Sequence, residues 1–255
     1  MQSIDVGLRI LQVLASHDSA LPLKTISELV GMAPSNVHRY LASFVRSGLL
    51  RQDQDTARYD LGRLALQVGL SALSRLDVME LAPRELKRLV AEHGLLGVIV
   101  IFGDQGATIV RFQQCSPPIT ISLALGSIVP TLRSASGQVF VAFLPEEITR
   151  HVVERELKLN VGYDLAPSTP RTAGEVRRLA EKVRTQFHSV VAVDVSPGIR
   201  AIASPILNTH GEAVATLCLM GPEKQLGSNH PALHALVKTC GQLSREAGYS
   251  GHWPE

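Results

Sequence analysis

The chain has 255 residues, of which 45% are hydrophobic and 19% are charged, and its formal net charge is +2. This length fits two small domains better than one, and the hydrophobic content is sufficient for a sizeable core. The small net charge excludes whole-chain basicity as an indication of nucleic-acid binding.

The three cysteines, at positions 115, 218 and 240, are odd in number and far apart. Their spacing matches neither a disulfide framework nor a set of metal ligands, so we expect a reducing cytoplasm. The N-terminus lacks the basic-then-apolar pattern of a signal peptide. Apolar runs are interrupted well short of the roughly 20 residues that a spanning helix needs, so we expect no membrane helix.

The first predicted element is a helix at about residues 4–16. Val6, Ile10, Val13 and Leu14 recur at helical spacing and form one apolar stripe, which we expect to pack under a later helix. Arg9 faces away from that stripe, where it would either contact a DNA phosphate or remain solvated.

Residues 21–59 predict a helix-turn-helix followed by a β hairpin. The first helix covers about residues 23–30, and Gly31 follows where a helix end favours positive φ. Pro34 suits the first turn of the second helix, which ends at Gly48. This order is typical of DNA-reading units, whereas the alternative is a plain helical hairpin with a solvated face.

The second helix has one bulky apolar side and one side that is short, polar or cationic. The apolar side carries Val37, Tyr40, Leu41, Phe44 and Val45. A helix in a major groove about 12 Å wide needs small polar residues and a few long donors, which the other side supplies. Residues 34–51 contain three arginines and no acidic residue, a local basic stripe that the average over residues 1–62 hides.

The β hairpin at residues 49–61 is a candidate wing, with Arg51 and Arg58 placed to contact phosphates. We predict that Ser35, Asn36, His38 and Arg39 face base edges, and that the DNA-binding surface also includes Arg46, Arg51 and Arg58.

Residues 62–76 then predict a helix with apolar side chains on more than one side. Such a helix can pack on its own domain and on a partner chain, although it could also be a core helix within one chain. The predicted domains are therefore a winged helix-turn-helix at 1–62, a linker helix at 63–77 and a second domain at 78–255.

The second half of the chain alternates strands and helices. We predict strands at 97–102, 108–112, 119–125, 190–195, 200–207 and 213–220, and helices at 81–92, 134–144, 148–156, 172–187 and 231–247. The helix at 172 opens with a capping box, Thr172 to Glu175. An antiparallel sheet with helices segregated on its faces is the expected α+β arrangement.

A ligand site is predicted where Ser134-Ala135-Ser136-Gly137 opens a helix. Free N–H groups at the positive helix end, small side chains and Arg133 beside them favour a small carboxylic acid, aromatic acids included. The alternative is ordinary capping by a serine. Asp194 would accept a hydrogen bond from a ligand hydroxyl or cap the Pro197-Gly198 turn.

Catalytic and metal patterns are weak. His230 and His234 are spaced like a metal pair, but no third ligand has a suitable spacing. Glu146 and Glu147 begin a helix, where carboxylates favour the dipole. No Ser/His/Asp set, phosphate loop or nucleophile elbow stands out, so we predict neither a catalytic site nor a metal or cofactor.

Several segments resemble one known family. Residues 31–41, with Gly48-Leu49-Leu50, are similar to the DNA-binding domain of the IclR family of bacterial transcriptional regulators. Residues 125–130, 134–137, 197–206 and 211–217 resemble its effector domain, a GAF-like α+β module. The resemblance covers nearly the whole chain, and the stretch at 62–66 is similar to the family's linker helix.

The resemblance implies an effector that alters operator binding, and a homodimer or a dimer of dimers. The residues that contact the effector in this family correspond to Ala135, Ser136, Asp194, Ala201, Cys218 and Met220 of this chain. Serines are common in the family at 218 and 220, so Cys218 and Met220 indicate a softer, more apolar pocket. Gln138 stands where the family usually has lysine, Asn36 where it often has threonine, and Tyr40 where it often has leucine.

The sequence therefore predicts a ligand-responsive regulator that reads a double-stranded, pseudo-palindromic operator as a dimer. Repression and activation both remain open. Two alternatives are an enzyme that turns over its ligand and a protein-docking module that uses the winged helix.

Overall fold

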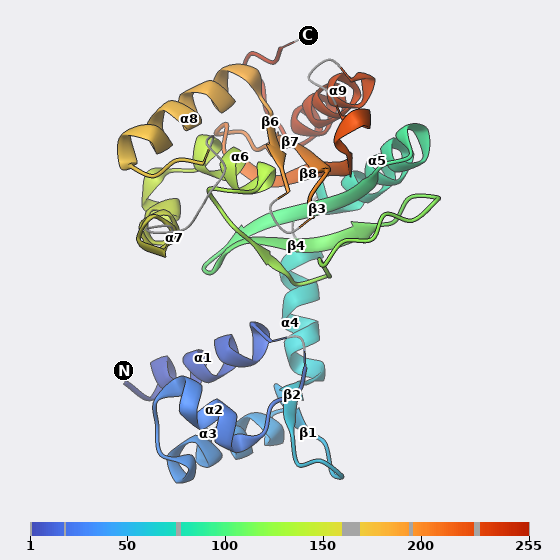
Figure 1. Cartoon of the computed structure of the whole chain (residues 1–255). Coiled ribbons are helices and arrows are strands. Elements are labelled where there is room, and N and C mark those ends of the chain that lie inside the picture. The colour runs from blue at the N-terminus through green and yellow to red at the C-terminus, as the bar shows by residue number, and fades with distance from the viewer. Residues whose placement is uncertain are drawn as a thin grey trace. The chain divides into compact units, whose positions relative to one another are not determined.

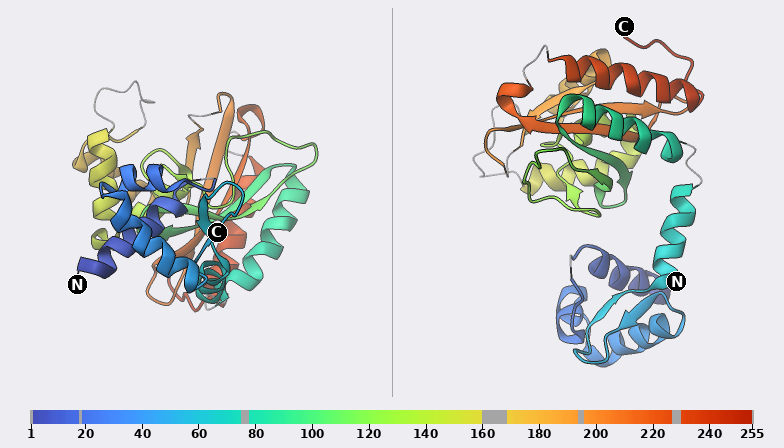
Figure 2. Two further views of the ribbon diagram at one scale, coloured as in Figure 1. Left: turned by 90° about the horizontal axis from the view of Figure 1, so that it is seen from below. Right: turned by 90° about the vertical axis from the view of Figure 1, so that its right-hand side faces the viewer.

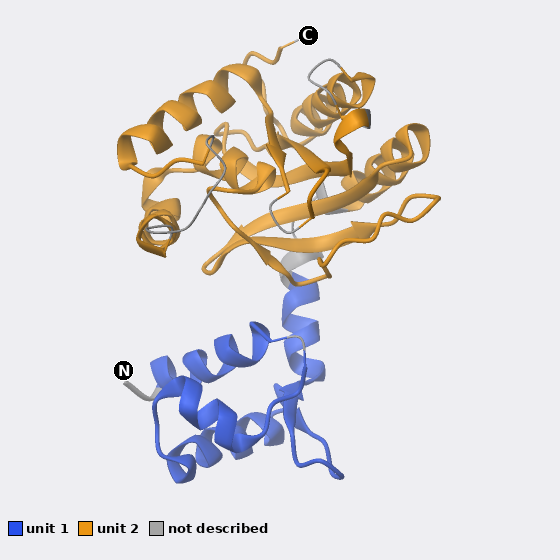
Figure 3. Cartoon of the chain, viewed as in Figure 1, with its two compact units in different colours: residues 1–76 blue, residues 77–255 orange. Residues whose placement is uncertain are grey.

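The computed structural model describes residues 2–17, 19–74, 78–159, 169–193, 196–226 and 230–254. The chain forms two compact units, residues 1–76 and 77–255 (Figure 3). Across the described ranges, none of the helices combines the length and the apolar character needed to cross a membrane. Asp194 and the end of the predicted linker helix, residues 75–77, lie outside the described residues.

The first unit has the predicted helices and hairpin. Its elements are α1 (Gln2–Ala15), α2 (Leu23–Val30), α3 (Pro34–Arg46), β1 (Leu50–Gln52), β2 (Tyr59–Leu61) and α4 (Arg63–Ser74). As predicted, α2 ends at Gly31, whose φ is +70°. Arg9 remains exposed, and its guanidinium also donates to the Val30 carbonyl at 2.5 Å, which satisfies a carbonyl at the end of α2.

One small core joins the helices of this unit. Ile10, Ile26, Val37 and Leu41 are fully buried, and Leu50 at the start of the hairpin is nearly so. Contributions come from α1, α2, α3 and β1, so the orientation of each helix depends on the others. The hairpin is fixed to this core because Tyr59 and Leu21 exchange backbone hydrogen bonds at 2.8 and 2.9 Å.

The second unit is built on one six-stranded antiparallel sheet in the order β5-β4-β3-β8-β7-β6 (Figure 1). Its strands are β3 (Leu96–Gly103), β4 (Gly106–Gln113), β5 (Ile128–Val129), β6 (Ser189–Ala192), β7 (Ile199–Leu207) and β8 (Ala213–Pro222). Its helices are α5 (Val78–His93), α6 (Ala135–Phe143), α7 (Glu146–Leu159), α8 (Ala173–Gln186) and α9 (Pro231–Glu246), with a 3₁₀ turn at Glu223–Gln225.

The helices of the second unit cover the sheet from both sides. Helices α5 and α9 pack on one face, whereas α6 packs on the other and α8 packs on α6 (Figures 1 and 2). The predicted capping box begins α8, since the Thr172 hydroxyl accepts from the Glu175 N–H at 3.3 Å. The α+β prediction is confirmed.

The predicted strand at residues 119–125 is wrong. This segment is irregular, and the short strand β5 forms the sheet edge instead. Ile119, Ile121 and Leu123 are half-buried against the core while the residues between them are exposed. Alternating apolar and polar residues indicate which side chains are buried. A segment that lies on a core can show this alternation without pairing to another strand.

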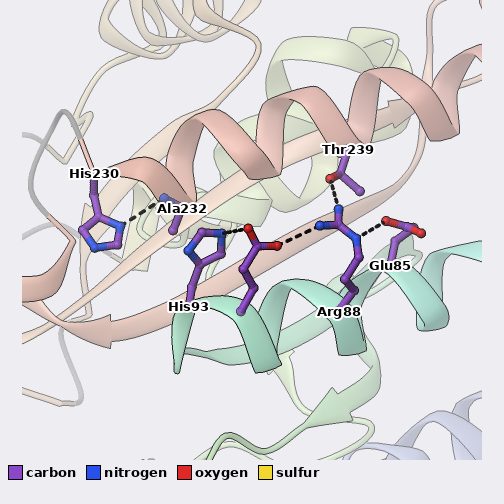
Figure 4. A network of polar contacts seen from close by, with 7 residues as sticks. Glu85, Arg88, His93, His230, Ala232 and Thr239 are labelled. Atoms are coloured by element: carbon purple, nitrogen blue, oxygen red, sulfur yellow. Dashed lines mark hydrogen bonds and ion pairs between the residues drawn. The ribbon is translucent and has the colours of Figure 1, made fainter.

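A polar network joins α5 to α9 (Figure 4). Arg88 on α5 donates to the Thr239 hydroxyl at 3.0 Å and pairs with Glu85 and Glu92 at 2.9 and 2.8 Å. His93, at the end of α5, packs edge-on against His230 with ring centroids 6.3 Å apart.

The His93 imidazole makes this joint sensitive to pH. Burial lowers its pKa below the usual 6.5; His230 and Arg88 act in the same direction, and Glu92 opposes them. The unfolded chain therefore takes up this proton more readily than the folded chain. The resulting stability is present above pH 6.5 and is lost as the pH falls through the folded pKa.

We predict that, when the pH is lowered from 7.5 to 5.5, the second unit loses less stability in His93→Gln than in the wild type. Thermal melts followed by the fluorescence of Trp253, the single tryptophan, measure this. His210→Gln, at an exposed turn, is the control and should follow the wild-type dependence. Some pH dependence should remain in His93→Gln, because burial also lowers the pKa of His188. Identical pH dependence in His93→Gln and wild type would contradict the assignment to His93.

Gly62 is a steric requirement of the first unit. A Cβ at this position would lie 2.3 Å from the Gly48 carbonyl oxygen, whereas one at Gly69 on α4 would meet nothing within 4 Å. We predict that Gly62→Ala lowers the free energy of unfolding of this unit by about 1–3 kcal/mol. Gly69→Ala should raise it by up to about 1 kcal/mol, because alanine favours helix.

Urea denaturation followed by circular dichroism tests this pair of variants, and Trp253 fluorescence reports separately on the second unit. Equal stability of the two variants would show that the backbone approach at Gly62 is not constraining.

Candidate nucleic-acid interface and ligand pocket

Helix α3 presents its predicted polar side to solvent. Val37 and Leu41 are fully buried, whereas all the predicted DNA-facing residues of this helix are exposed: Ser35, Asn36, His38, Arg39 and Arg46. Pro34 occupies the first turn, where its missing N–H is not needed. The burial of two core residues on one side therefore fixes the direction in which the polar side points.

Contacts along the exposed side of α3 are local and weak. The Ser43 hydroxyl donates to the Arg39 carbonyl at 3.1 Å, and Arg46 reaches the same hydroxyl at 3.4 Å. The neutral Ser43 contact leaves the charge of Arg46 uncompensated, so it remains available for a phosphate.

The wing arginines are more constrained than the sequence suggested. Arg51 and Asp60 are directly opposite each other in the hairpin, and their side chains pair at 2.5 Å although Arg51 remains 73% exposed. Arg58 donates to the Ala20 carbonyl at 3.5 Å. Sequence reasoning missed the Asp60 pairing because it depends on the cross-strand register.

The tip of the wing is shaped by Asp53. One of its carboxylate oxygens accepts from the Thr56 N–H and hydroxyl at 2.8 Å each and from the Asp55 N–H at 3.2 Å. These bonds, those from Thr56 above all, lower the pKa of Asp53. The turn is thus ordered without glycine, although Ala57 takes a φ of +54°.

A pocket of about 630 Å³, its mouth included, lies between the sheet and α6 in the second unit. Every predicted effector residue that the structure describes lines it: Arg133, Ser134, Ala135, Ser136, Ala201, Cys218 and Met220. Sequence reasoning missed the apolar remainder, which comprises Val98, Val100, Ile109, Leu123, Val129, Pro130, Val191 and Val193.

The sheet register explains how distant residues meet in this pocket. Met220 on β8 is directly opposite Ala201 on β7, and Cys218 is directly opposite Val98 on β3. Alternate residues of a strand share one face, so Cys218 and Met220 lie on the same side of the sheet. Period-2 patterns predict such faces within a strand, but strand order decides which residues come together.

The polar end of the pocket is the start of α6. The Ser134 hydroxyl accepts from the Gly137 N–H at 3.1 Å, so the capping interpretation is correct for this side chain. Ser134 nevertheless lines the pocket together with half-buried Arg133. The positive helix end and a guanidinium thus lie beside an apolar cavity.

The inner part of the pocket is less polar than its residue names suggest. The Ser136 hydroxyl accepts from the Thr216 hydroxyl at 2.9 Å. Burial raises the pKa of Cys218 to about 12, so its thiol stays protonated at neutral pH. Cys218 therefore serves as a small wall residue and not as a nucleophile.

Gln138 has a structural environment of its own. Gln138 is not one of the described residues that line the pocket. Its side-chain amide donates to the Leu132 carbonyl at 3.0 Å and accepts from the Ser189 hydroxyl at 2.5 Å.

Metal binding finds no support in the described ranges, where no group of three or more histidine, cysteine or acidic residues could hold an ion. The Nδ1 atom of His230 accepts from the Ala232 N–H at 3.1 Å and caps α9. This bond engages the Nδ1 lone pair of His230.

Two family models match this chain. Residues 3–54 match the IclR helix-turn-helix domain, and residues 70–245 match the IclR C-terminal domain of bacterial transcriptional regulators. The transcriptional repressor IclR of Escherichia coli is 25% identical over 227 residues, which cover 87% of this chain and 80% of that protein. The regulator BhcR of Paracoccus denitrificans is 29% identical, over 98% of this chain and 87% of its own length.

Solved structures agree with these matches. Pseudomonas aeruginosa HmgR is 34% identical, with a TM-score of 0.60, and the alignment covers 99% of this chain and 100% of HmgR. An IclR homologue from Microbacterium hydrocarbonoxydans, solved with 4-hydroxybenzoate, has the same fold at 16% identity and a TM-score of 0.77, over 96% of this chain and 98% of the homologue. Both models match in chain order and together cover most of the chain. This chain therefore belongs to the IclR family of DNA-binding transcriptional regulators.

Proposed function

We propose that this regulator reads operator DNA with α3 and senses a small carboxylic acid in the pocket between α6 and the sheet. The observation that carries the ligand half is the meeting of Arg133, the α6 N-terminus and an apolar sheet face in one cavity. An acid with a compact apolar body suits such a site, since its carboxylate meets positive charge and its body meets valines.

For DNA, we place Ser35, Asn36, His38 and Arg39 at base edges in the major groove. Arg46, Arg51 and Arg58 would contact phosphates. Support comes from the exposure of all these side chains and from the short side chains around Arg39, which permit close approach. The Asp60 carboxylate would hold the Arg51 guanidinium in place, while the other N–H groups of this guanidinium face the DNA phosphates.

The Microbacterium homologue with 4-hydroxybenzoate supports an aromatic acid as one candidate effector. In this chain the sheet face supplies Cys218 and Met220, which are soft and weakly polar. We therefore favour a monocarboxylate with an apolar body over a polyhydroxylated acid. Asp194 remains a proposed contact from the sequence.

We propose that each chain has three parts, residues 1–62, 63–77 and 78–255, and that two chains form a homodimer. Along α4, the side chains of Leu66, Val68 and Leu70 are 61%, 59% and 54% exposed. Leu66 and Leu70 share one side of the helix, and a partner chain would bury this apolar surface. Two DNA-binding domains would then read half-sites about one helical turn apart. The effector must bind one arrangement of the dimer more tightly than the other, because equal affinity would shift nothing.

Arg39→Ala should weaken binding to a duplex selected by the wild-type protein by about tenfold or more at ~150 mM salt. Arg39→Lys keeps the charge but loses the two-pronged donor. It should therefore keep the salt dependence while discriminating less between base pairs. Gel shifts with the selected duplex and single-base variants measure both, and wild-type affinity in both proteins would contradict the placement of α3.

Benzoate and 4-hydroxybenzoate should raise the melting temperature of the full chain in a concentration-dependent way, because a ligand that binds only the folded state stabilises it. Neutral benzamide should raise it less. Arg133→Gln should reduce the difference between benzoate and benzamide. An acid-independent response, or none with aromatic and short aliphatic acids alike, would contradict a carboxylate site here.

A further inference from the structure

The rim of the pocket is a turn, residues 130–134, that leads into α6. Thr131 and Leu132 in this turn are fully buried, so their backbone N–H groups need partners within the protein. Both N–H groups donate to the carboxylate of Glu156 on α7, at 2.5 Å from Thr131 and 2.8 Å from Leu132. Each oxygen of this half-buried carboxylate therefore serves one amide of the rim.

The same turn is held from its other side. The Leu132 carbonyl accepts from the Gln138 amide at 3.0 Å, and Gln138 accepts in turn from the Ser189 hydroxyl on β6 at 2.5 Å. Both backbone polar groups of Leu132 are thus fixed by side chains. The rim is tied to α7 by Glu156 and to the sheet by Gln138.

The rim also packs tightly on the first turn of α6. A Cβ at Gly137 would lie 2.3 Å from the Thr131 carbonyl oxygen and 2.5 Å from its Cα. Since real Cβ atoms do not approach so closely, only glycine allows this packing. A displacement of Thr131 would therefore displace the N-terminus of α6, together with Arg133 and Ser134 between them.

Helix α7 is anchored to the β3–β4 turn, which lies beside it in Figure 1. Arg155 donates to the Gln105 carbonyl at 2.8 Å, and His151 bonds to the Asp104 carbonyl at 2.7 Å. Strands β3 and β4 supply Val98, Val100 and Ile109 to the pocket floor. Glu156 thus joins the polar rim to a helix that also binds the turn between the two floor strands.

We propose that Glu156 is a positioning residue of the effector pocket. It does not line the cavity; instead it orients the rim so that Arg133 and the α6 N–H groups face a ligand carboxylate. This inference rests on the proposed function. Ionised acceptors make strong bonds to N–H groups, and a glutamine would direct its own N–H₂ at one of the two amide donors.

The test is calorimetric titration of the full chain with benzoate and with neutral benzamide. We expect Glu156→Gln to weaken benzoate binding by about tenfold, the size of one lost charged hydrogen bond, and to change benzamide binding little. The preference for benzoate over benzamide should therefore be smaller in Glu156→Gln than in the wild type. Glu154→Gln, an exposed residue on the same helix with the same change of charge, should keep the wild-type preference.

An unchanged or increased benzoate preference in Glu156→Gln would overturn the inference, since loss of a nearby negative charge alone would favour the anion. If this variant does not fold, Glu156→Asp is measured in the same way. Its shorter side chain cannot reach both amides, and an unchanged preference there would also overturn the inference. If the wild-type chain binds no aromatic or short aliphatic acid, the carboxylate site itself fails, and the positioning role of Glu156 fails with it. By contrast, a wild type that prefers benzoate and a variant with the same preference would overturn only the role of Glu156.

Discussion

The DNA-binding unit depends on the burial of Val37 and Leu41 in α3. These two side chains pack with Ile10 and Ile26 and lose all contact with solvent. Burying side chains of this size contributes about 1.5–3 kcal/mol each, which far exceeds any cost of exposing the short polar residues opposite. The core therefore determines which side of α3 can meet DNA, and the arginines require no further device to point outward.

The ligand pocket depends on a different constraint, the meeting of a helix start with an apolar sheet face. Ala135 and Ser136 are small residues on the side of α6 that lines the pocket, and Gly137 allows Thr131 to pack on the first turn of α6. The sheet offers valines, Cys218 and Met220, none of which satisfies a carboxylate. Among the described lining residues, charge recognition thus falls to the rim at Arg133 and Ser134, whose position depends on Glu156 and Gln138.

Sequence patterns predicted most elements because their signals are local. Gly31, Pro34 and Thr172 mark helix ends, and apolar spacing within α3 distinguishes its two sides. Strand pairing is not local, which is why 119–125 was predicted as a strand although only its burial alternates. The wing pair of Arg51 with Asp60 depends on register, and Glu156 meets residues 24 and 25 positions earlier. Arg133 and Ser134 followed from the pattern of a helix start, and Ala201, Cys218 and Met220 followed from the family resemblance, whereas the pocket's valines required the sheet order.

The central claim, that the exposed side of α3 enters the major groove, is tested most directly by affinity cleavage. An iron-chelate probe attached to Ser35→Cys can be placed selectively because Cys115, Cys218 and Cys240 are buried. On a duplex selected by the wild-type protein, we predict cleavage centred within each half-site. A probe on Lys238→Cys in α9, an exposed position, provides the comparison. Cleavage from Ser35→Cys that is absent, or no more localised than cleavage from Lys238→Cys, would contradict the account.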